Sequence, residues 1–241
     1  MSTNLTDLNP LPRHTTPGWQ RLLRFFARMI MLPVARIDVQ GMEHVPPDAF
    51  MGVTNHMSSF DTLALIAIGP IRRIALFAAI EHRSDFIAGW ALNQLRVIWL
   101  RRGEADREAI KIALDEIKSG SAFGIAIEGT RSKTGALLEG KTGAAYLATR
   151  ANIPILPAVI WGTEKIKHNL RKFKRTTVHI RIGEPFHLPE GRAGTEQLQQ
   201  YTNQIMLKMA SMLPSEYWGV YAERMKEQLA MNNDQLAIPL R

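Results

Sequence analysis

His56 and Asp61 are the two side chains whose types and spacing best suit proton transfer. They belong to the segment NHMSSFD, residues 55–61, which lies between a short apolar run and a stretch of helical character. If the helix begins near Ser58, Asp61 falls in its first turn and its carboxylate can reach back to the imidazole. A carboxylate on one ring nitrogen orients the ring, so that the other nitrogen can remove a proton from a hydroxyl group. The pair therefore predicts a general base that activates an alcohol.

Two other interpretations of this segment stay open. Ser58 and Asp61 match the S-x-x-D pattern of a helix capping box, which needs no catalysis. Ser58 or Ser59 could instead be a nucleophile, although neither serine lies in the G-x-S-x-G elbow that exposes such a residue.

A second group of polar residues, EGTRS at 128–132, directly follows the apolar run 122–127. Gly129 allows the main chain to approach a ligand closely, and Arg131 offers a planar fork that matches phosphate. Glu128 can orient that arginine or accept a hydrogen bond from a substrate hydroxyl. An ordinary polar turn is the alternative, because turns are rich in such residues. The candidate binding residues of this segment are Glu128, Gly129, Thr130 and Arg131.

Two more basic residues stand at the ends of expected elements. Arg102 follows an apolar strand at 97–100, and Lys141 opens a helix after Gly140. Ligands of α/β domains bind beyond the carboxyl ends of the strands. Arginines that follow a buried strand, such as Arg101 and Arg102, are therefore better candidates for contact with an anionic group than arginines on helix faces. Ordinary surface charges are the alternative for these residues and for Lys141.

The elements that must position these residues are short strands alternating with helices. This alternation predicts an α/β domain over residues 36–241, with a central mixed, largely parallel sheet flanked by helices. Strands are expected at 36–40, 50–54, 73–79, 97–100, 122–127, 155–161 and 176–182, and helices at 60–67, 86–95, 104–118, 141–149 and 193–213.

Residues 1–35 are expected to form a flexible arm and then an amphipathic helix. Arg21, Arg24 and Arg28 share one helical stripe, and apolar residues cover most of the remaining surface. A helix of about 14 residues, from Trp19 to Leu32, measures roughly 21 Å, which is too short to cross ~30 Å of hydrocarbon. We expect it to lie in a membrane interface, with the arginines at the level of the lipid phosphates. The alternative is an ordinary amphipathic helix packed on the domain.

The composition limits the chemistry and suggests the partners. The chain has no cysteine, which excludes thiol catalysis and zinc sites built on cysteine. Its formal charge of +8 favours anionic partners, such as membrane phosphates, phosphorylated substrates, coenzyme A, an acidic carrier protein or nucleic acid. A solvated basic surface without such a partner is the alternative.

Taken in order, the motifs resemble those of the 1-acylglycerol-3-phosphate acyltransferases, the lysophosphatidic acid acyltransferases of phospholipid synthesis. Asn55, His56 and Asp61 match the N-H-x-x-x-x-D motif, Arg102 in VIWLRRG resembles the second motif, and EGTRS matches letter for letter. The following K-x-G-A begins at Lys141, and Pro157 lies in an apolar strand like that of the fourth motif. The resemblance covers residues from about 36 to 187.

This resemblance implies transfer of a fatty acyl group from acyl-CoA or acyl-carrier protein to the hydroxyl of lysophosphatidic acid, which yields phosphatidic acid. His56 would be the general base, oriented by Asp61, without an acyl-enzyme, a metal or a cofactor. The acceptor would be held by Arg102, Glu128, Gly129, Thr130, Arg131 and Lys141. The partners would be the acceptor, the acyl donor and an anionic membrane surface, with no nucleic acid and with a peripheral location on the cytoplasmic face.

The sequence departs from the family pattern at two places. Ala126-Ile127 stand where Phe-Pro often precede the glutamate, and the segment AAIEHR lacks a lysine common between the first two motifs. His82 and Arg83 lie nearby, so the contacts to the acyl donor stay open. Another acceptor is the alternative: glycerol-3-phosphate, another lysophospholipid or a lyso-aminolipid. A non-catalytic protein that binds anionic membranes is a further alternative, against which the intact His56–Asp61 pair argues.

Overall fold

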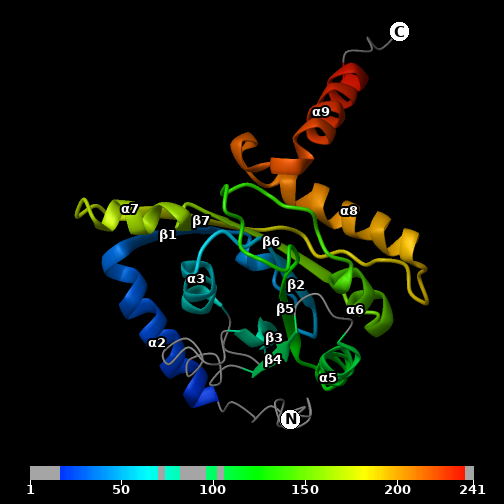
Figure 1. Cartoon of the computed structure of the whole chain (residues 1–241), viewed down its shortest axis with the longest axis horizontal. Helices are drawn as coiled ribbons and strands as arrows, with labels where there is room; N and C mark the ends of the chain where they lie inside the picture. Colours follow the sequence, from blue (N-terminus) through cyan, green and yellow to red (C-terminus); the bar gives the residue numbers. More distant parts are fainter. Residues whose placement is uncertain (1–16, 70–73, 82–95, 102–105, 237–241) are drawn as a thin grey trace.

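The structure is a computed structural model, and it describes residues 17–69, 74–81, 96–101 and 106–236. These residues form a seven-stranded sheet with the strand order β1-β7-β6-β2-β5-β3-β4 (Figure 1). The strands are β1 (Ala35–Gln40), β2 (Met51–Thr54), β3 (Ile74–Ala79), β4 (Arg96–Leu100), β5 (Ala122–Ala126), β6 (Ile155–Trp161) and β7 (Thr176–Ile182).

Five neighbouring strands of the sheet, from β6 to β4, run parallel to one another. β7 is antiparallel to β6, and β1 pairs with β7 in parallel. The sheet is therefore mixed and largely parallel, as the alternation of elements predicted. Because parallel strands end at the same edge, the segments that follow β2, β5 and β6 come together there.

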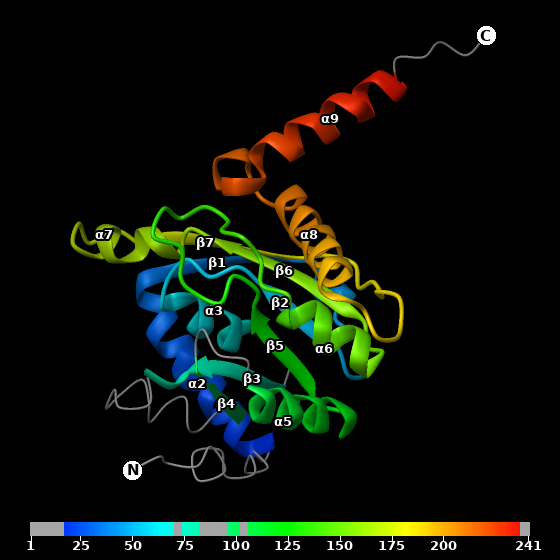
Figure 2. The same cartoon turned by 45° about the vertical axis from the view of Figure 1, so that its right-hand side comes forward.

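Helices cover both faces of the sheet and enclose two apolar cores (Figures 1 and 2). One core contains residues of α5 (Arg107–Lys118), α6 (Gly143–Ala151) and α8 (Thr195–Ser211). The other contains residues of α2 (Pro17–Val34) and α3 (Phe60–Ile68). Successive residues of β6 serve the two cores in turn, since side chains alternate across a strand: Val159 packs into the first and Ile160 into the second.

The helix α2 occupies the place of the expected amphipathic helix, and two of its arginines bond the protein. Arg24 Nε donates to Ala67 O at 3.2 Å, and Arg28 Nε donates to the same carbonyl at 2.9 Å. That carbonyl lies in the last turn of α3, where helical C=O groups lack partners within the helix and cations are favoured. The expected place of Arg24 and Arg28 at the lipid phosphates is thus corrected. The opposite face of α2 is exposed and apolar: Leu22, Phe25, Phe26, Met29, Ile30 and Leu32. None of the helices in the described ranges is long and apolar enough to span a membrane.

The expected element boundaries hold with small shifts. The helix expected at 104–118 begins at Arg107, because the side chain of Asp106 caps it by accepting from Ala109 N at 3.0 Å. The helix expected at 141–149 begins at Gly143. The helix expected at 86–95 lies outside the described residues. The boundary proposed between residues 35 and 36 stays a prediction; α2 leads directly into β1.

Several elements were not expected from the sequence. They are the short helix α7 (Ile166–Leu170), the C-terminal helix α9 (Ala222–Leu236), and four 3-10 turns, η1 (Met42–His44), η3 (Thr163–Lys165), η4 (Ser215–Tyr217) and η5 (Gly219–Tyr221). Figure 2 shows α9 projecting away from the body of the molecule beyond α8.

Candidate active site

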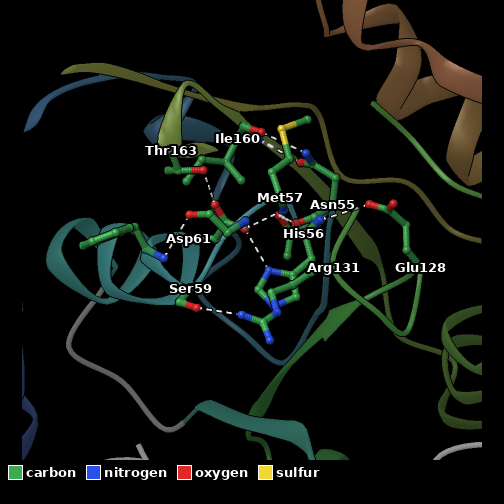
Figure 3. A network of polar contacts seen from close by, with 12 residues as sticks. Asn55, His56, Met57, Ser59, Asp61, Glu128, Arg131, Ile160 and Thr163 are labelled. Atoms are coloured by element: carbon green, nitrogen blue, oxygen red, sulfur yellow. Dashed lines mark hydrogen bonds and ion pairs between the residues drawn. The ribbon is translucent and has the colours of Figure 1, made fainter. Parts of the chain in front are cut away.

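The predicted pairing of His56 and Asp61 is present at the carboxyl edge of the sheet. His56 lies two residues beyond the end of β2, and Asp61 is in the first turn of α3. His56 Nδ1 and Asp61 Oδ2 are 2.7 Å apart (Figure 3). The imidazole side chain is 23% exposed and the carboxylate side chain 2%. One ring nitrogen is therefore held by a buried carboxylate. The described residues supply no partner to the other, Nε2.

Four donors surround the Asp61 carboxylate and fix its direction. Oδ2 also accepts the main-chain N–H groups of Met57 at 2.7 Å and Ser58 at 2.8 Å. Oδ1 accepts a short hydrogen bond from the hydroxyl of Thr163. Bonds to a charged acceptor are about twice as strong as neutral ones, and they offset the desolvation of a buried carboxylate. Asp61 therefore combines half of the expected capping box, its bond from Ser58 N–H, with the orientation of His56.

The two serines of this segment have structural partners. Ser58 Oγ accepts the N–H of Phe60 at 3.0 Å, next to the start of α3. Ser59 Oγ accepts from Arg131 Nη1 at 2.8 Å. The described residues place no general base beside either hydroxyl, so their geometry favours His56 over a serine nucleophile.

The main chain of His56 is held from both sides by the segment 128–132. Glu128 Oε1 accepts the N–H of His56 at 3.0 Å, and the carbonyl of His56 accepts the N–H of Ser132 at 2.8 Å. Figure 3 shows Asp61 and Glu128 on opposite sides of the chain at residues 55–57. The loop after β5 thus sets the position of His56.

Glu128 is buried and does not line the hollow beside Arg131. The residue is 2% exposed, and its second oxygen, Oε2, accepts the N–H of Leu138 at 2.9 Å. Burial raises the pKa of Glu128 to about 7, although the two main-chain hydrogen bonds lower it. This placement differs from the expected contact with substrate: the carboxyl group positions the His56 main chain and the chain near Leu138.

Thr130 and Arg131 line a hollow of about 500 Å³, and their contact with substrate stays a prediction. Arg131 is exposed, and its bond to Ser59 ties it to the first turn of α3. Other residues around this hollow are Ser58, Phe60, Lys133, Glu164 and Lys167. The hollow therefore carries basic groups next to the His56–Asp61 pair, as binding of an anionic substrate requires.

The remaining expected binding residues have different places. Gly129 has a φ of +68°, a conformation that glycine adopts readily, and this turns the chain between Glu128 and Thr130. The N–H of Lys141 donates to Ile127 O at 2.8 Å, but its side chain lines a separate hollow of about 470 Å³ together with Tyr221 and Arg224. Arg102 lies outside the described residues.

Two supporting residues were given no role by reasoning from the sequence, although Asn55 belongs to the N-H-x-x-x-x-D motif. Asn55 is fully buried and exchanges hydrogen bonds with the main chain of Ile160, at 2.8 and 2.9 Å, which ties the end of β2 to β6. Thr163 is 1% exposed and holds Asp61. Its position two residues after the buried strand β6 was the available signal, because the same rule pointed to residues after β2 and β5.

The geometry fits removal of a proton from a hydroxyl by His56 Nε2, with Asp61 stabilising the imidazolium that forms. Among the described residues, no three His, Asp or Glu side chains gather as a metal site would need.

Comparison with known proteins finds similarity to 1-acyl-sn-glycerol-3-phosphate acyltransferases. A chloroplast 1-acyl-sn-glycerol-3-phosphate acyltransferase of Brassica napus is 28% identical over 152 residues, which are 60% of this chain and 43% of that protein. The human 1-acyl-sn-glycerol-3-phosphate acyltransferase alpha is 31% identical over 128 residues, 52% of this chain and 45% of that protein. The chain thus spans less than half the length of these curated relatives.

A solved structure has the same fold. The crystal structure of a 1-acyl-sn-glycerophosphate acyltransferase from Thermotoga maritima matches with a TM-score of 0.63 and 24% identity, covering 87% of both chains. In addition, residues 36–161 match the family described as acyltransferase, a range that includes His56, Asp61 and the 128–132 segment. Because this match covers more than half of the chain, the chain belongs to the acyltransferase family.

Proposed function

We propose that this protein transfers a fatty acyl group from acyl-CoA or acyl-carrier protein to the free hydroxyl of lysophosphatidic acid. The bond between His56 Nδ1 and the buried Asp61 carboxylate is the observation that carries this proposal. The family gives the reaction class, and the names of the relatives give the acceptor that is most worth testing.

In the proposed reaction, His56 Nε2 removes the proton of the acceptor hydroxyl while Asp61 holds Nδ1–H. The alkoxide attacks the thioester carbonyl of the donor and forms a new C–O bond. The tetrahedral intermediate then expels the thiolate, which receives the proton from His56. The products are an ester and a free thiol, and no acyl-enzyme forms. The oxyanion needs hydrogen-bond donors, for which main-chain N–H groups near the site are the natural source.

Arg131 is proposed to bind the phosphate of the acceptor, with Thr130 beside it. Both residues line the same hollow as the first turn of α3, so a phosphate at Arg131 would bring the glycerol hydroxyl toward His56. Lys141 packs against Gly129: its Cγ lies 3.5 Å from the position that a Cβ on Gly129 would take. Its contact with the phosphate would require the side chain to leave the second hollow.

We also propose that the protein is peripheral, on the cytoplasmic face of a membrane, and that α2 is its anchor. The exposed apolar side chains of α2 include Phe25 at 56%, Phe26 at 54% and Ile30 at 49%. The arginine bonds to α3 fix this face outward, away from the domain. Insertion of these side chains between lipids would remove them from water and bring the enzyme to an acceptor that resides in the bilayer.

A panel assay tests the reaction and its acceptor. Purified protein is given acyl-CoA or acyl-carrier protein as donor, and lysophosphatidic acid, glycerol-3-phosphate, lysophosphatidylcholine or monoacylglycerol as acceptor. We expect the highest kcat/KM with lysophosphatidic acid, and His56→Ala should lower kcat by ~10²–10⁴ with circular dichroism unchanged. Preference for another acceptor would replace the substrate but keep the mechanism. Wild-type turnover in His56→Ala would refute the mechanism, and no transfer to any acceptor would favour the non-catalytic membrane binder.

A separate variant tests the anchor. Replacing Phe25, Phe26 and Ile30 with serine should weaken vesicle binding and lower turnover of long-chain acceptor. Turnover of a short-chain, soluble acceptor should stay close to wild type. Equal vesicle binding by this variant and the wild type would show that α2 is only a packing helix.

A further inference from the structure

The segment 167–175, which we call the basic loop, concentrates positive charge at one place on the protein. It contains five lysines and arginines and no acidic residue. Arg175 is engaged within the fold, since its Nη2 donates to Ala35 O at 2.7 Å. The other four are exposed and have no ion-pair partner among the described residues: Lys167, Arg171, Lys172 and Lys174. These side chains are free to bind an anionic partner.

Phe173 stands at the tip of this loop and is 100% exposed. Leu170, in the last turn of α7, is 50% exposed. Burial within the fold does not account for either side chain. A fully exposed aromatic ring among basic residues has the composition of membrane-interface segments, where the ring enters the headgroup region and the cations bind phosphates.

The conformation of the loop is defined and presents Phe173 outward. The N–H of Lys174 donates to Asn169 O at 3.0 Å, and the N–H of Phe173 donates to Leu170 O at 3.0 Å. These two bonds form the Schellman motif that ends many helices, in which the residue before the last donor is left-handed. Phe173 occupies that position with a φ of +55°, where glycine is normally favoured. A bulky side chain in this conformation is a feature of functional surfaces more than of folding.

The position of the loop relates it to both α2 and the hollow. β7 begins at Thr176, which pairs with Ala35, the residue that follows α2. The basic loop thus lies beside the C-terminal end of α2, and Figures 1 and 2 both show α7 and α2 on the same side of the molecule. At its other end, Lys167 lines the hollow that contains Arg131. The loop bridges the proposed anchor and the proposed acceptor site.

We propose that the basic loop is a second membrane contact, which inserts Phe173 among the headgroups of an anionic bilayer and binds their phosphates through Arg171, Lys172 and Lys174. A single interfacial helix leaves the protein free to rotate about the helix axis. A second contact removes this freedom and turns the hollow at Arg131 toward the lipid surface. This inference rests on the peripheral membrane location given under Proposed function.

Vesicle co-sedimentation with the full chain tests this contact. The vesicles are phosphatidylcholine, alone or mixed with phosphatidylglycerol. Each basic side chain near an anionic surface strengthens binding about fivefold. We therefore expect the triple variant Arg171→Gln, Lys172→Gln and Lys174→Gln to bind mixed vesicles about 100-fold more weakly. Phe173→Gly should weaken binding while keeping or raising the melting temperature, because glycine suits the left-handed position.

A charge-matched control separates a local contact from net charge. Lys111→Gln, Lys118→Gln and Arg192→Gln together remove the same charge from exposed positions outside the basic loop. This control should bind mixed vesicles nearly as the wild type does. Equal losses in the control and the loop variant would overturn the proposal, as would unchanged vesicle binding in both loop variants. Unchanged vesicle binding together with weaker binding of acyl-carrier protein would overturn it in favour of an acidic protein partner.

The catalytic proposal can fail separately. All variants are assayed on a short-chain, soluble acceptor, which does not depend on docking. Loop variants that keep this activity and lose vesicle binding support the second contact. If the wild type transfers no acyl group to any acceptor, the proposed reaction fails, while the vesicle measurements still decide whether the loop binds lipid.

Discussion

Replacing Glu128 with glutamine should change how the stability of the protein depends on pH. Burial raises the pKa of Glu128 from 4.5 to about 7 in the folded state. Between these values the folded protein holds a proton that the unfolded chain has released. The free energy of unfolding therefore decreases as the pH rises through this window, and the loss is complete above the folded pKa. The shift corresponds to about 3 kcal/mol. Glutamine does not titrate, so the variant lacks this loss.

The measurement is urea unfolding of wild type and Glu128→Gln at several pH values from about 4.5 to about 8. The stability of the variant relative to wild type should rise by about 3 kcal/mol over this range. Other groups that titrate contribute equally to both proteins and cancel in the difference. The difference in stability between variant and wild type also contains a contribution that does not depend on pH. It arises because one of the two N–H groups bonded to Glu128 would face the glutamine NH₂ group.

Glu128→Met measures that contribution. Methionine also does not titrate, so its difference from wild type should have the same slope with pH. It accepts neither N–H group, and each buried donor left without a partner costs about 1–3 kcal/mol. The Glu128→Met variant should therefore be less stable than Glu128→Gln by about this amount at every pH. A difference between wild type and Glu128→Gln that stays constant within ~0.5 kcal/mol across the range would refute the reasoning. The carboxyl group would then be ionised throughout, held by its two N–H donors.

Three further substitutions test individual contacts. Thr163→Val keeps the shape of the side chain but removes one donor from the Asp61 carboxylate, and it should cost about 1.5–3 kcal/mol in urea unfolding, whereas Thr163→Ser should recover most of it. Arg131→Ala should raise KM for lysophosphatidic acid by roughly 10- to 100-fold, from a loss of about 1.5–3 kcal/mol; an equal effect with monoacylglycerol would refute the contact with phosphate. Arg28→Ala should lower stability by about 1 kcal/mol through loss of its bond to α3. Vesicle binding by Arg28→Ala should remain close to wild type. A large loss of vesicle binding would show that Arg28 contacts lipid phosphates.

The sequence was sufficient to predict the alternation of strands and helices and the place of His56 and Asp61. Both follow from local rules: side-chain periodicity, and the tendency of site residues to lie after strand ends. The two residues are close in sequence, so a turn of the chain before α3 is enough to bring Asp61 back to His56. The contact of Asp61 with Thr163 could not be predicted from spacing, because it joins residues 102 positions apart through the pairing of β2 with β6.

The orientation of α2 shows a second limit. Periodicity separates an arginine stripe from an apolar face, but it does not say which face meets the protein. The apolar face of an amphipathic helix usually packs on the protein. In the proposed membrane contact of α2, that face instead meets the lipid. Here Arg24 and Arg28 satisfy carbonyls at the end of α3, and only the tertiary structure reveals that these carbonyls lie within reach.

The segment 128–132 contains residues with two different contacts, although the sequence presents it as a single polar motif. Its two ends, Glu128 and Ser132, bond the N–H and the C=O of His56. The left-handed turn at Gly129 separates Glu128 from Thr130 and Arg131, which line the hollow together with Ser132. In the proposed mechanism, a substrate bound to Arg131 would therefore act on the same loop that holds the main chain of His56. We propose that these five residues set the position of the acceptor phosphate together with that of His56, and a misplacement of about 1 Å can lower a rate by ~10². Changes at the two ends should then act on kcat, and changes in the middle on KM.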